Sequence, residues 1–286
     1  MEESMKDYEE MLEESYSLMG DGVHDTDALL AWRRVEELKE TQENIFVTVS
    51  EIVKGGVVAD FEETNEMLHY FLKKAIGKRI INKPQILICC PSNITEVEKN
   101  AIKDAAEKTG AKKVFLEIEP KVAAIGAGMD ISKPSGNMVI DIGGGTTDIA
   151  ILSLGGIVES ASIRVAGNAF DNDIIKYIKD KYKLLVGERT AEEIKITIGT
   201  VFPGSRNEKM EVRGRDLVTG LPHTITLTSE EVEEGLRESV YTIIHAAKGI
   251  LEQTPPELSA DIIDKGIVLT GGGSLVDGFN QLLAQE

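Results

Sequence analysis

Cysteine, aromatic residues, positive charge and long apolar runs are all scarce in this chain. Its 286 residues include two cysteines, and these two, Cys89 and Cys90, are neighbours in the sequence. Adjacent side chains on a strand point to opposite faces, so a disulfide between them is not expected. A reducing cytoplasm is the simplest setting for such a chain. Neither the cysteines nor the four histidines show metal-ligand spacing.

The charge balance and the apolar pattern exclude further classes of protein. Forty-nine acidic residues against 31 Lys and Arg give a net charge of −18. This argues against nucleic acid as a partner, because a phosphate backbone needs a basic face. The acidic N-terminal region has no apolar signal core, and no apolar run is long enough to cross a bilayer. The length and a hydrophobic fraction of 42% suggest a folded protein of about two domains.

The most informative stretch is residues 138–152, MVIDIGGGTTDIAIL. The β-branched residues on both sides of the glycines predict two strands joined by a hairpin. Three consecutive glycines remove every Cβ, so backbone N–H groups can close around an anion, and two threonines add hydroxyl donors. Asp141 and Asp148 would repel a phosphate, but they suit a divalent cation or an attacking water beside one. A glycine-rich hairpin without a ligand is the alternative interpretation.

A second glycine cluster follows another apolar strand near the end of the chain. Residues 266–274, GIVLTGGGS, predict a strand, then glycines, then the start of a helix. Strand, glycines and helix N-terminus form the usual arrangement for holding a nucleotide. One such loop is weak evidence, whereas two in one chain are much stronger.

These patterns occur together in one family. Residues 55–286 resemble the bacterial actins, the rod-shape-determining proteins MreB and Mbl, and the wording of residues 88–91 and 119–122 is nearer to Mbl. The resemblance rests on five runs: GGVVADFEET at 55–64, PSNITEVE at 91–98, EPKVAAIGAG at 119–128, GERTAEEIK at 187–195 and TPPEL at 254–258.

The resemblance implies an ATP site with Mg²⁺ and assigns a role to each matching residue. Glu119 would position the attacking water, Asp141 would organise Mg²⁺ through water, and Thr147 would join them in the catalytic set. The implied phosphate contacts are Gly143, Gly144, Gly145 and Thr146. The implied nucleoside contacts are Glu192, Glu193, Lys195, Gly271, Gly272, Gly273 and Ser274. Without the resemblance, Glu119 would be interpreted as an acid favoured by a helix N-terminus, and residues 192–195 as a solvated face.

The resemblance also implies partners and a location. Residues 78–83 place Ile80 and Ile81 among basic residues, and in the resembled family an apolar loop here helps the protein lie on the membrane. Cations around apolar side chains suit an anionic lipid surface, although a plain loop packed on the body is an equal alternative. The implied protein is cytoplasmic and membrane-associated. It forms filaments with itself at the inner membrane face and works with cell-wall synthesis and cell-shape proteins.

Residues 1–54 form an acidic segment that does not resemble this family. Residues 31–38 and 45–60 instead resemble a fragment of the small-subunit ribosomal protein that is built from repeated OB folds. The chain would then be a join near residues 55–60. The fragment is too short to complete an OB barrel of five strands, which argues against a role in RNA binding.

The expected fold is α/β: the actin-like ATPase fold with ribonuclease-H-like sheets, the first half incomplete and the second nearly complete. Residues 55–136 would be a remnant of the first subdomain, and residues 137–286 the second half, with a small peripheral lobe at about 186–245. The family's first phosphate hairpin, an Asp-x-Gly-Thr-type run, has no match in residues 1–54.

The expected function is that of an ATP-binding, filament-forming cytoskeletal protein of cell-shape control, a weak ATPase at most without the first hairpin. One alternative is a non-catalytic scaffold, or a recombined fragment, with a relic nucleotide site. Another is a sugar kinase or a chaperone ATPase on the same fold, but neither a sugar pocket nor a substrate-binding domain has a trace in the sequence.

Overall fold

The computed structural model describes residues 53–54, 57–58, 70, 85–90, 92, 94–108 and 112–286. The predictions for residues 1–52, and for Ile80 and Ile81, lie outside these residues. The first described elements are two short strands, β1 (Val53–Lys54) and β2 (Val57–Val58), which pair antiparallel.

A strand, a helix and a second strand form the next unit. Strands β3 (Gln85–Cys90) and β4 (Lys113–Ile118) pair in parallel, and helix α5 (Glu96–Lys108) connects them. Cys90, Ile94 and Ile102 form the buried cluster between the helix and the strands. Both cysteines are free, as expected from their adjacency.

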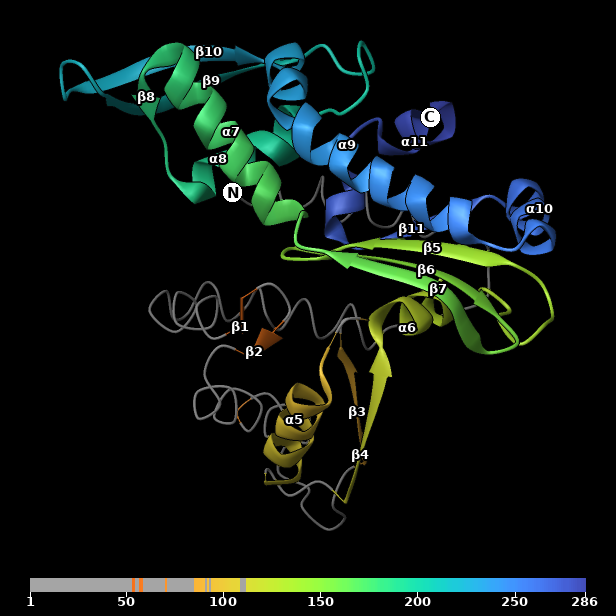
Figure 1. Cartoon of the computed structure of the whole chain (residues 1–286). Coiled ribbons are helices and arrows are strands. Elements are labelled where there is room, and N and C mark those ends of the chain that lie inside the picture. The colour runs from red at the N-terminus through yellow and green to blue at the C-terminus, as the bar shows by residue number, and fades with distance from the viewer. Residues whose placement is uncertain are drawn as a thin grey trace.

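A four-stranded sheet in the order β11-β5-β6-β7 forms the middle layer of the molecule (Figure 1). Strand β6 (Thr147–Ser153) runs antiparallel to both β5 (Asn137–Ile142) and β7 (Gly156–Ile163), and β11 (Ile267–Thr270) lies parallel to β5. The expected strand–turn–strand at residues 138–152 is confirmed. Its strands are almost entirely buried because helices cover both faces.

Each face of this sheet has its own apolar cluster. On one face, helix α6 (Glu119–Gly126) places Ala124 against Val139 and Ala150. On the other face lie helices α7 (Gly167–Tyr182), α9 (Ser229–Gln253), α10 (Pro256–Lys265) and α11 (Phe279–Gln285) (Figure 1). The alternation along β5 and β6 therefore puts Asp141 and Asp148 on the α6 face, two residues from Val139 and Ala150.

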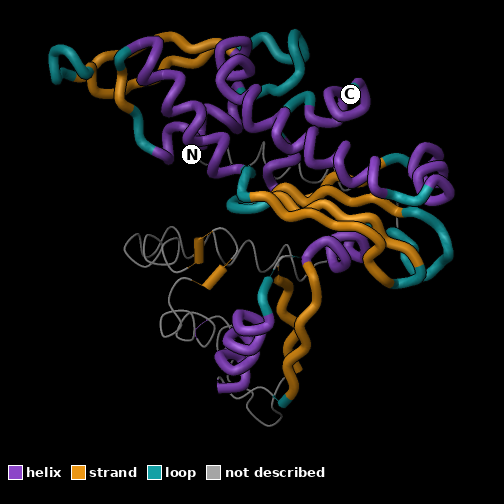
Figure 2. Tube along the Cα trace, in the orientation of Figure 1, coloured by secondary structure: helices purple, strands orange, loops and turns teal. Residues whose placement is uncertain are grey.

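A smaller sheet in the order β10-β9-β8 lies at the far end of α7 and α9 (Figure 2). It contains β8 (Leu184–Leu185), β9 (Lys209–Asp216) and β10 (Pro222–Thr228), and helix α8 (Glu188–Ile198) packs beside it. Thr228 and Glu231 form a complete capping box at the start of α9. The domain divisions given above stay a prediction.

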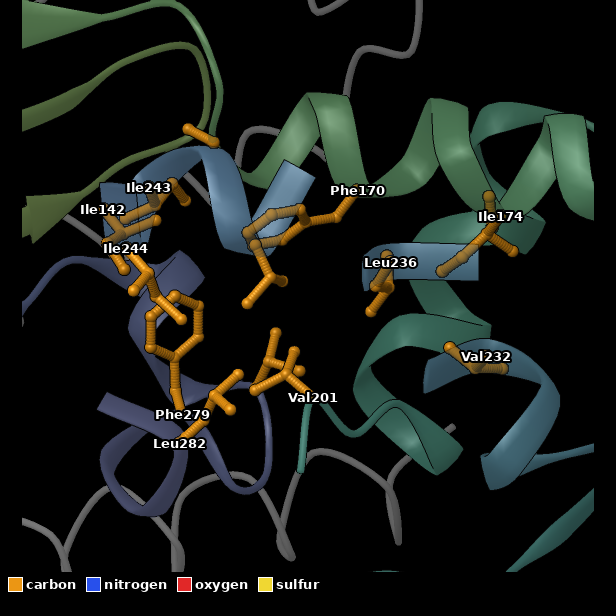
Figure 3. Close-up of a cluster of buried hydrophobic side chains, with 14 of the residues drawn as sticks. Ile142, Phe170, Ile174, Val201, Val232, Leu236, Ile243, Ile244, Phe279 and Leu282 are labelled. Carbon is orange, nitrogen blue, oxygen red and sulfur yellow. The ribbon is translucent and has the colours of Figure 1, made fainter. Parts of the chain in front are cut away.

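The main core lies directly behind the glycine hairpin. Ile142, the last residue of β5, packs with Phe170 of α7 and Phe279 of α11, and all three side chains are fully or almost fully buried (Figure 3). The root of the hairpin is therefore fixed by packing from three different elements. Among the described residues, no helix is both long and apolar enough to cross a membrane.

Candidate functional site

The hairpin between β5 and β6 is a tight turn in which three carbonyls and the first amide form hydrogen bonds within the protein. The Gly143 N–H donates to the Thr146 carbonyl at 2.9 Å. The first N–H groups of α7 donate to the hairpin: Gly167 to the Gly143 carbonyl at 3.0 Å and Asn168 to the Gly144 carbonyl at 2.8 Å. Within the described part of the chain, no hydrogen bond uses the N–H groups of residues 144–146. These donors remain available for an anion.

The second glycine cluster packs directly against the root of this hairpin. Thr270, at the end of β11, is in register with Asp141 of β5. Gly271 follows at φ +83°, and a Cβ there would lie 2.3 Å from the Ile142 carbonyl oxygen and 2.6 Å from Asp141 Oδ1. A Cβ on Gly273 would lie 2.5 Å from Ile142 Cγ2. The absence of side chains therefore lets the two loops touch.

The helix expected after these glycines is at first only a short 3₁₀ turn, η1 (Gly272–Leu275). The Ser274 hydroxyl is already hydrogen-bonded within this turn, because it donates to the Gly271 carbonyl at 2.6 Å. The α-helix proper, α11, begins at Phe279. Ser274 thus stabilises the loop that carries Gly271 and Gly272, and any contact it makes with a nucleoside would have to accommodate this bond.

Three carboxylates approach one another on the α6 face of the sheet. Asp141 and Asp148 are paired in register on β5 and β6, and Glu119 opens α6. Burial, then the charges of Asp148 and Asp141, raise the pKa of Glu119 to about 7. Burial also raises the pKa of Asp141; the Thr270 side chain counteracts this effect and the charge of Asp148 adds to it. Perturbed carboxyl groups gathered in this way are typical of functional sites.

Asp148 is buried and tied to the first part of the chain. Its Oδ1 accepts hydrogen bonds from the Ser92 backbone N–H at 3.1 Å and from the Ser92 hydroxyl at 2.8 Å. Its Oδ2 is buried and has no partner among the described residues. The sequence contains no signal for Ser92, because no local pattern links it to a residue 56 positions later.

Thr147 and Thr146 are both buried. The Thr147 hydroxyl donates to the Val165 carbonyl at 2.6 Å, which ties β6 to the segment that leads into α7. This bond engages the Thr147 donor inside the protein. A catalytic role for Thr147 stays a prediction. In this geometry its hydrogen bond helps to hold the hairpin in position.

Lys195 reaches the hairpin side of α7, whereas Glu192 and Glu193 are exposed on α8. The Lys195 ammonium forms an ion pair with Asp171 at 2.9 Å and donates to the Gly167 carbonyl at 3.3 Å. Burial raises the pKa of Asp171, and Lys195 counteracts this effect. Asp171 had no signal in the sequence, since it is 24 residues from its partner and on another helix.

The donors suit a hydrated divalent cation better than a directly ligated one. Carboxylate oxygens are the ligands that Mg²⁺ prefers, and Mg²⁺ usually keeps several of its waters. Among the described residues, no three His, Cys, Asp or Glu side chains are close enough together to hold a metal directly. The implied role of Asp141, holding Mg²⁺ through water, is compatible with this arrangement.

Comparisons with known proteins agree with this geometry. The family model described as MreB/Mbl protein matches residues 36–286. The chain is 64% identical over 234 residues to the cell shape-determining protein Mbl of Bacillus subtilis, covering 82% of this chain and 70% of that protein. It is 46% identical over 235 residues to MreB of Escherichia coli K12, covering 82% of this chain and 68% of that protein.

Solved structures show the same relationship. The crystal structure of MreB5 of Spiroplasma citri bound to AMPPNP is similar at a TM-score of 0.77 and 41% identity, covering 82% of this chain and 70% of that one. The MamK double helical filament, at 21% identity and a TM-score of 0.68, shares the fold.

The expected ribosomal fragment is not supported. The family match begins at residue 36, so it already includes residues 45–60, which had been compared with the OB-fold protein. This chain belongs to the MreB/Mbl family of cell shape-determining, actin-like proteins and has the actin-like ATPase fold.

Proposed function

We propose that this chain binds ATP together with Mg²⁺ at the glycine hairpin and the Gly271 loop. The observation that carries the proposal is the contact between the two loops, where a Cβ on Gly271 would meet both Ile142 and Asp141. That contact places amide donors beside a carboxylate, which is the combination that a phosphate and its cation require. MreB5 of Spiroplasma citri has been solved with AMPPNP and with ADP.

Each part of the site has a proposed role. The hairpin of residues 143–146 holds the terminal phosphates through the amides of residues 144–146, and Asp141 holds Mg²⁺ through water. The cation neutralises phosphate charge when it is bound. Glu119 accepts a hydrogen bond from the attacking water. Glu192, Glu193 and Lys195, with residues 271–274, hold the nucleoside. Asp171 fixes the ammonium of Lys195 at the N-terminus of α7.

Titration of the purified chain with ATP, in millimolar Mg²⁺ and in EDTA, tests this proposal. We expect a micromolar Kd that requires Mg²⁺, and at least tenfold weaker binding for Asp141→Ala. Asp264→Ala is the matched control, because Asp264 is an exposed carboxylate on α10. Absence of binding up to millimolar ATP would refute the proposal and would favour a scaffold with a relic site.

We further propose that turnover by this chain is slow. Hydrolysis requires groups on both sides of the phosphates, and the sequence contains no match to the family's first phosphate hairpin. Phosphate release from bound ATP, measured beside Glu119→Ala, tests this point. A rate equal to that of Glu119→Ala would mean that the site binds nucleotide without catalysing its hydrolysis.

The cellular part of the proposal is a filament of this chain at the cytoplasmic face of the membrane, acting with cell-wall synthesis and cell-shape proteins. MamK, which shares the fold, forms a double helical filament. Sedimentation with and without ATP tests self-assembly. Flotation with anionic vesicles, beside Ile80→Ser and Ile81→Ser variants, tests the membrane loop. Loss of vesicle binding in both variants is the expected result, and unchanged flotation would contradict it.

A further inference from the structure

The second glycine loop is held at both of its ends by contacts that leave no room for a side chain. At its start, Gly271 packs against the root of the hairpin. At its end, Gly278 has φ +80°, and a Cβ there would lie 2.4 Å from Phe202 Cβ and 3.1 Å from Ser205 Oγ. Residues 271–274 therefore lie between two fixed points, one at the hairpin and one at the connection between α8 and β9.

A short parallel bridge links this second point to the end of α8. Thr200, the second residue after α8, pairs with Asp277. The Val201 N–H donates to the Asp277 carbonyl at 2.9 Å. The Arg206 guanidinium donates to the Gly199 carbonyl at 3.2 Å, which holds the same connection against the C-terminal end of the helix. The glycine loop and α8 are thus joined through the residues that follow α8.

Three side chains reinforce the bridge with a chain of hydrogen bonds. Ser205 Oγ lies 2.5 Å from Asp277 Oδ2 and 2.6 Å from Thr200 Oγ1. A hydroxyl has one proton and a carboxylate only accepts, so Ser205 donates to Asp277 and Thr200 donates to Ser205. Bonds that run in one direction in this way polarise and strengthen one another. Thr200 is 1% exposed, so its end of the chain is shielded from water.

The apolar core holds this region independently of the hydrogen bonds. Val201 packs with Phe279 and Leu282 in the main cluster, and all three are buried (Figure 3). Ser205, in contrast, is exposed. Removal of its hydroxyl therefore leaves the core intact and releases only the side chain of Asp277.

We infer that Ser205 and Asp277 are positioning residues that set the separation between α8 and residues 271–274. This inference rests on the proposed function, in which a nucleoside lies between these two elements. The contact of Gly271 with the hairpin does not involve Ser205 or Asp277. Loss of the Ser205 hydroxyl should therefore loosen the enclosure of the nucleoside and leave the phosphate-binding hairpin as it is.

Binding of ADP and of its 2-aminopurine analogue, both with Mg²⁺, tests the inference. We expect Ser205→Ala to weaken both ligands about fivefold, the effect of one lost hydrogen bond. Iodide should quench the fluorescence of the bound 2-aminopurine about twofold more strongly in this variant, because a looser site buries less of its ligand. Asp277→Ala should show the same two changes. Ser205→Thr keeps the hydroxyl and should reverse both.

The chain contains a matched control for this experiment. The Ser132 hydroxyl donates to Asp130 Oδ1 at 2.6 Å, in a second Ser–Asp pair at the surface. Ser132→Ala should change neither affinity nor quenching. Unchanged affinity or unchanged quenching in Ser205→Ala, or a failure of Ser205→Thr to reverse the changes, would overturn this inference alone. No binding of ADP by the unaltered chain would overturn the proposed function as well.

Discussion

Replacing Gly271 by alanine should damage the site through two separate physical effects. The residue has φ +83° and ψ 154°, a backbone conformation that residues other than glycine rarely adopt. The new Cβ would also lie 2.3 Å from a backbone oxygen, that of Ile142, which cannot rotate away. Strain of this kind costs about 1–3 kcal/mol, and overpacking adds about 1–3 kcal/mol. We expect a loss of about 4 kcal/mol in the free energy of unfolding.

Two other glycines separate the two effects. Gly220 has φ +74° and nothing within 4 Å of its Cβ position, so Gly220→Ala measures strain alone, at about 1 kcal/mol or slightly more. Gly273 has no positive φ but would place a Cβ 2.5 Å from Ile142 Cγ2. Gly273→Ala therefore measures crowding alone, at about 1–3 kcal/mol, because its nearest neighbour is a side chain and the backbone oxygens of Ile142 and Gly143 lie farther away, at 3.0 and 3.2 Å.

Urea unfolding followed by circular dichroism gives the three free energies, and ATP titration gives the effect on the site. A loss of about 4 kcal/mol moves the midpoint by roughly 1–2 M urea for a slope of about 2–3 kcal/mol per molar. We also expect weaker ATP binding for Gly271→Ala but not for Gly220→Ala. If Gly271→Ala costs no more than Gly220→Ala, the two glycine loops do not touch as described, and the central argument for the site fails.

Three further substitutions test other parts of the structure. The folded protein keeps a proton on Glu119 up to about pH 7, whereas the unfolded chain releases it near the ordinary value of 4.5, so stability falls as pH rises between these values. The pKa difference corresponds to at most about 3.4 kcal/mol, which partial exposure reduces to about 1–2 kcal/mol. In EDTA, unfolding at pH 5 and pH 8 should show this loss for the wild type but not for Glu119→Gln. Lys195→Met leaves the carboxylate of Asp171 buried and unpaired, which should cost about 3 kcal/mol, and an added Asp171→Asn should recover most of it; an additive double variant would contradict the pairing. Thr228→Ala removes the cap of α9 and should cost about 1 kcal/mol with unchanged ATP affinity.

The sequence predicts those parts of the fold that depend on backbone conformation over a short stretch. The strands on either side of the glycines follow from β-branched residues, and the start of α9 follows from Thr228 and Glu231 three positions apart. The glycines at 271 and 273 could be recognised because a loop that approaches another backbone has no room for a Cβ. Each of these signals lies within a few residues of the feature that it specifies.

The sequence does not predict the pairs that join separate elements. The bonds of Ser92 to Asp148, and of Lys195 to Asp171, connect residues 56 and 24 positions apart. Thr147 looks from the sequence like a donor for a ligand, but its hydroxyl is used by the Val165 carbonyl. Such bonds depend on how the helices and the sheet pack, and no short stretch of a single sequence specifies that packing.

The two sides of the site are held in different ways, so substitutions on the two sides should affect nucleotide binding differently. The hairpin and the Gly271 loop are fixed by the core around Ile142, so a substitution there changes stability and nucleotide affinity together. The contact from Ser92 to Asp148 consists of two hydrogen bonds from one residue that precedes α5. Weakening it leaves the glycine loops in place and removes only the orientation of one carboxylate. Variants at Gly271 should therefore bind ADP poorly, whereas variants at Ser92 should bind ADP normally.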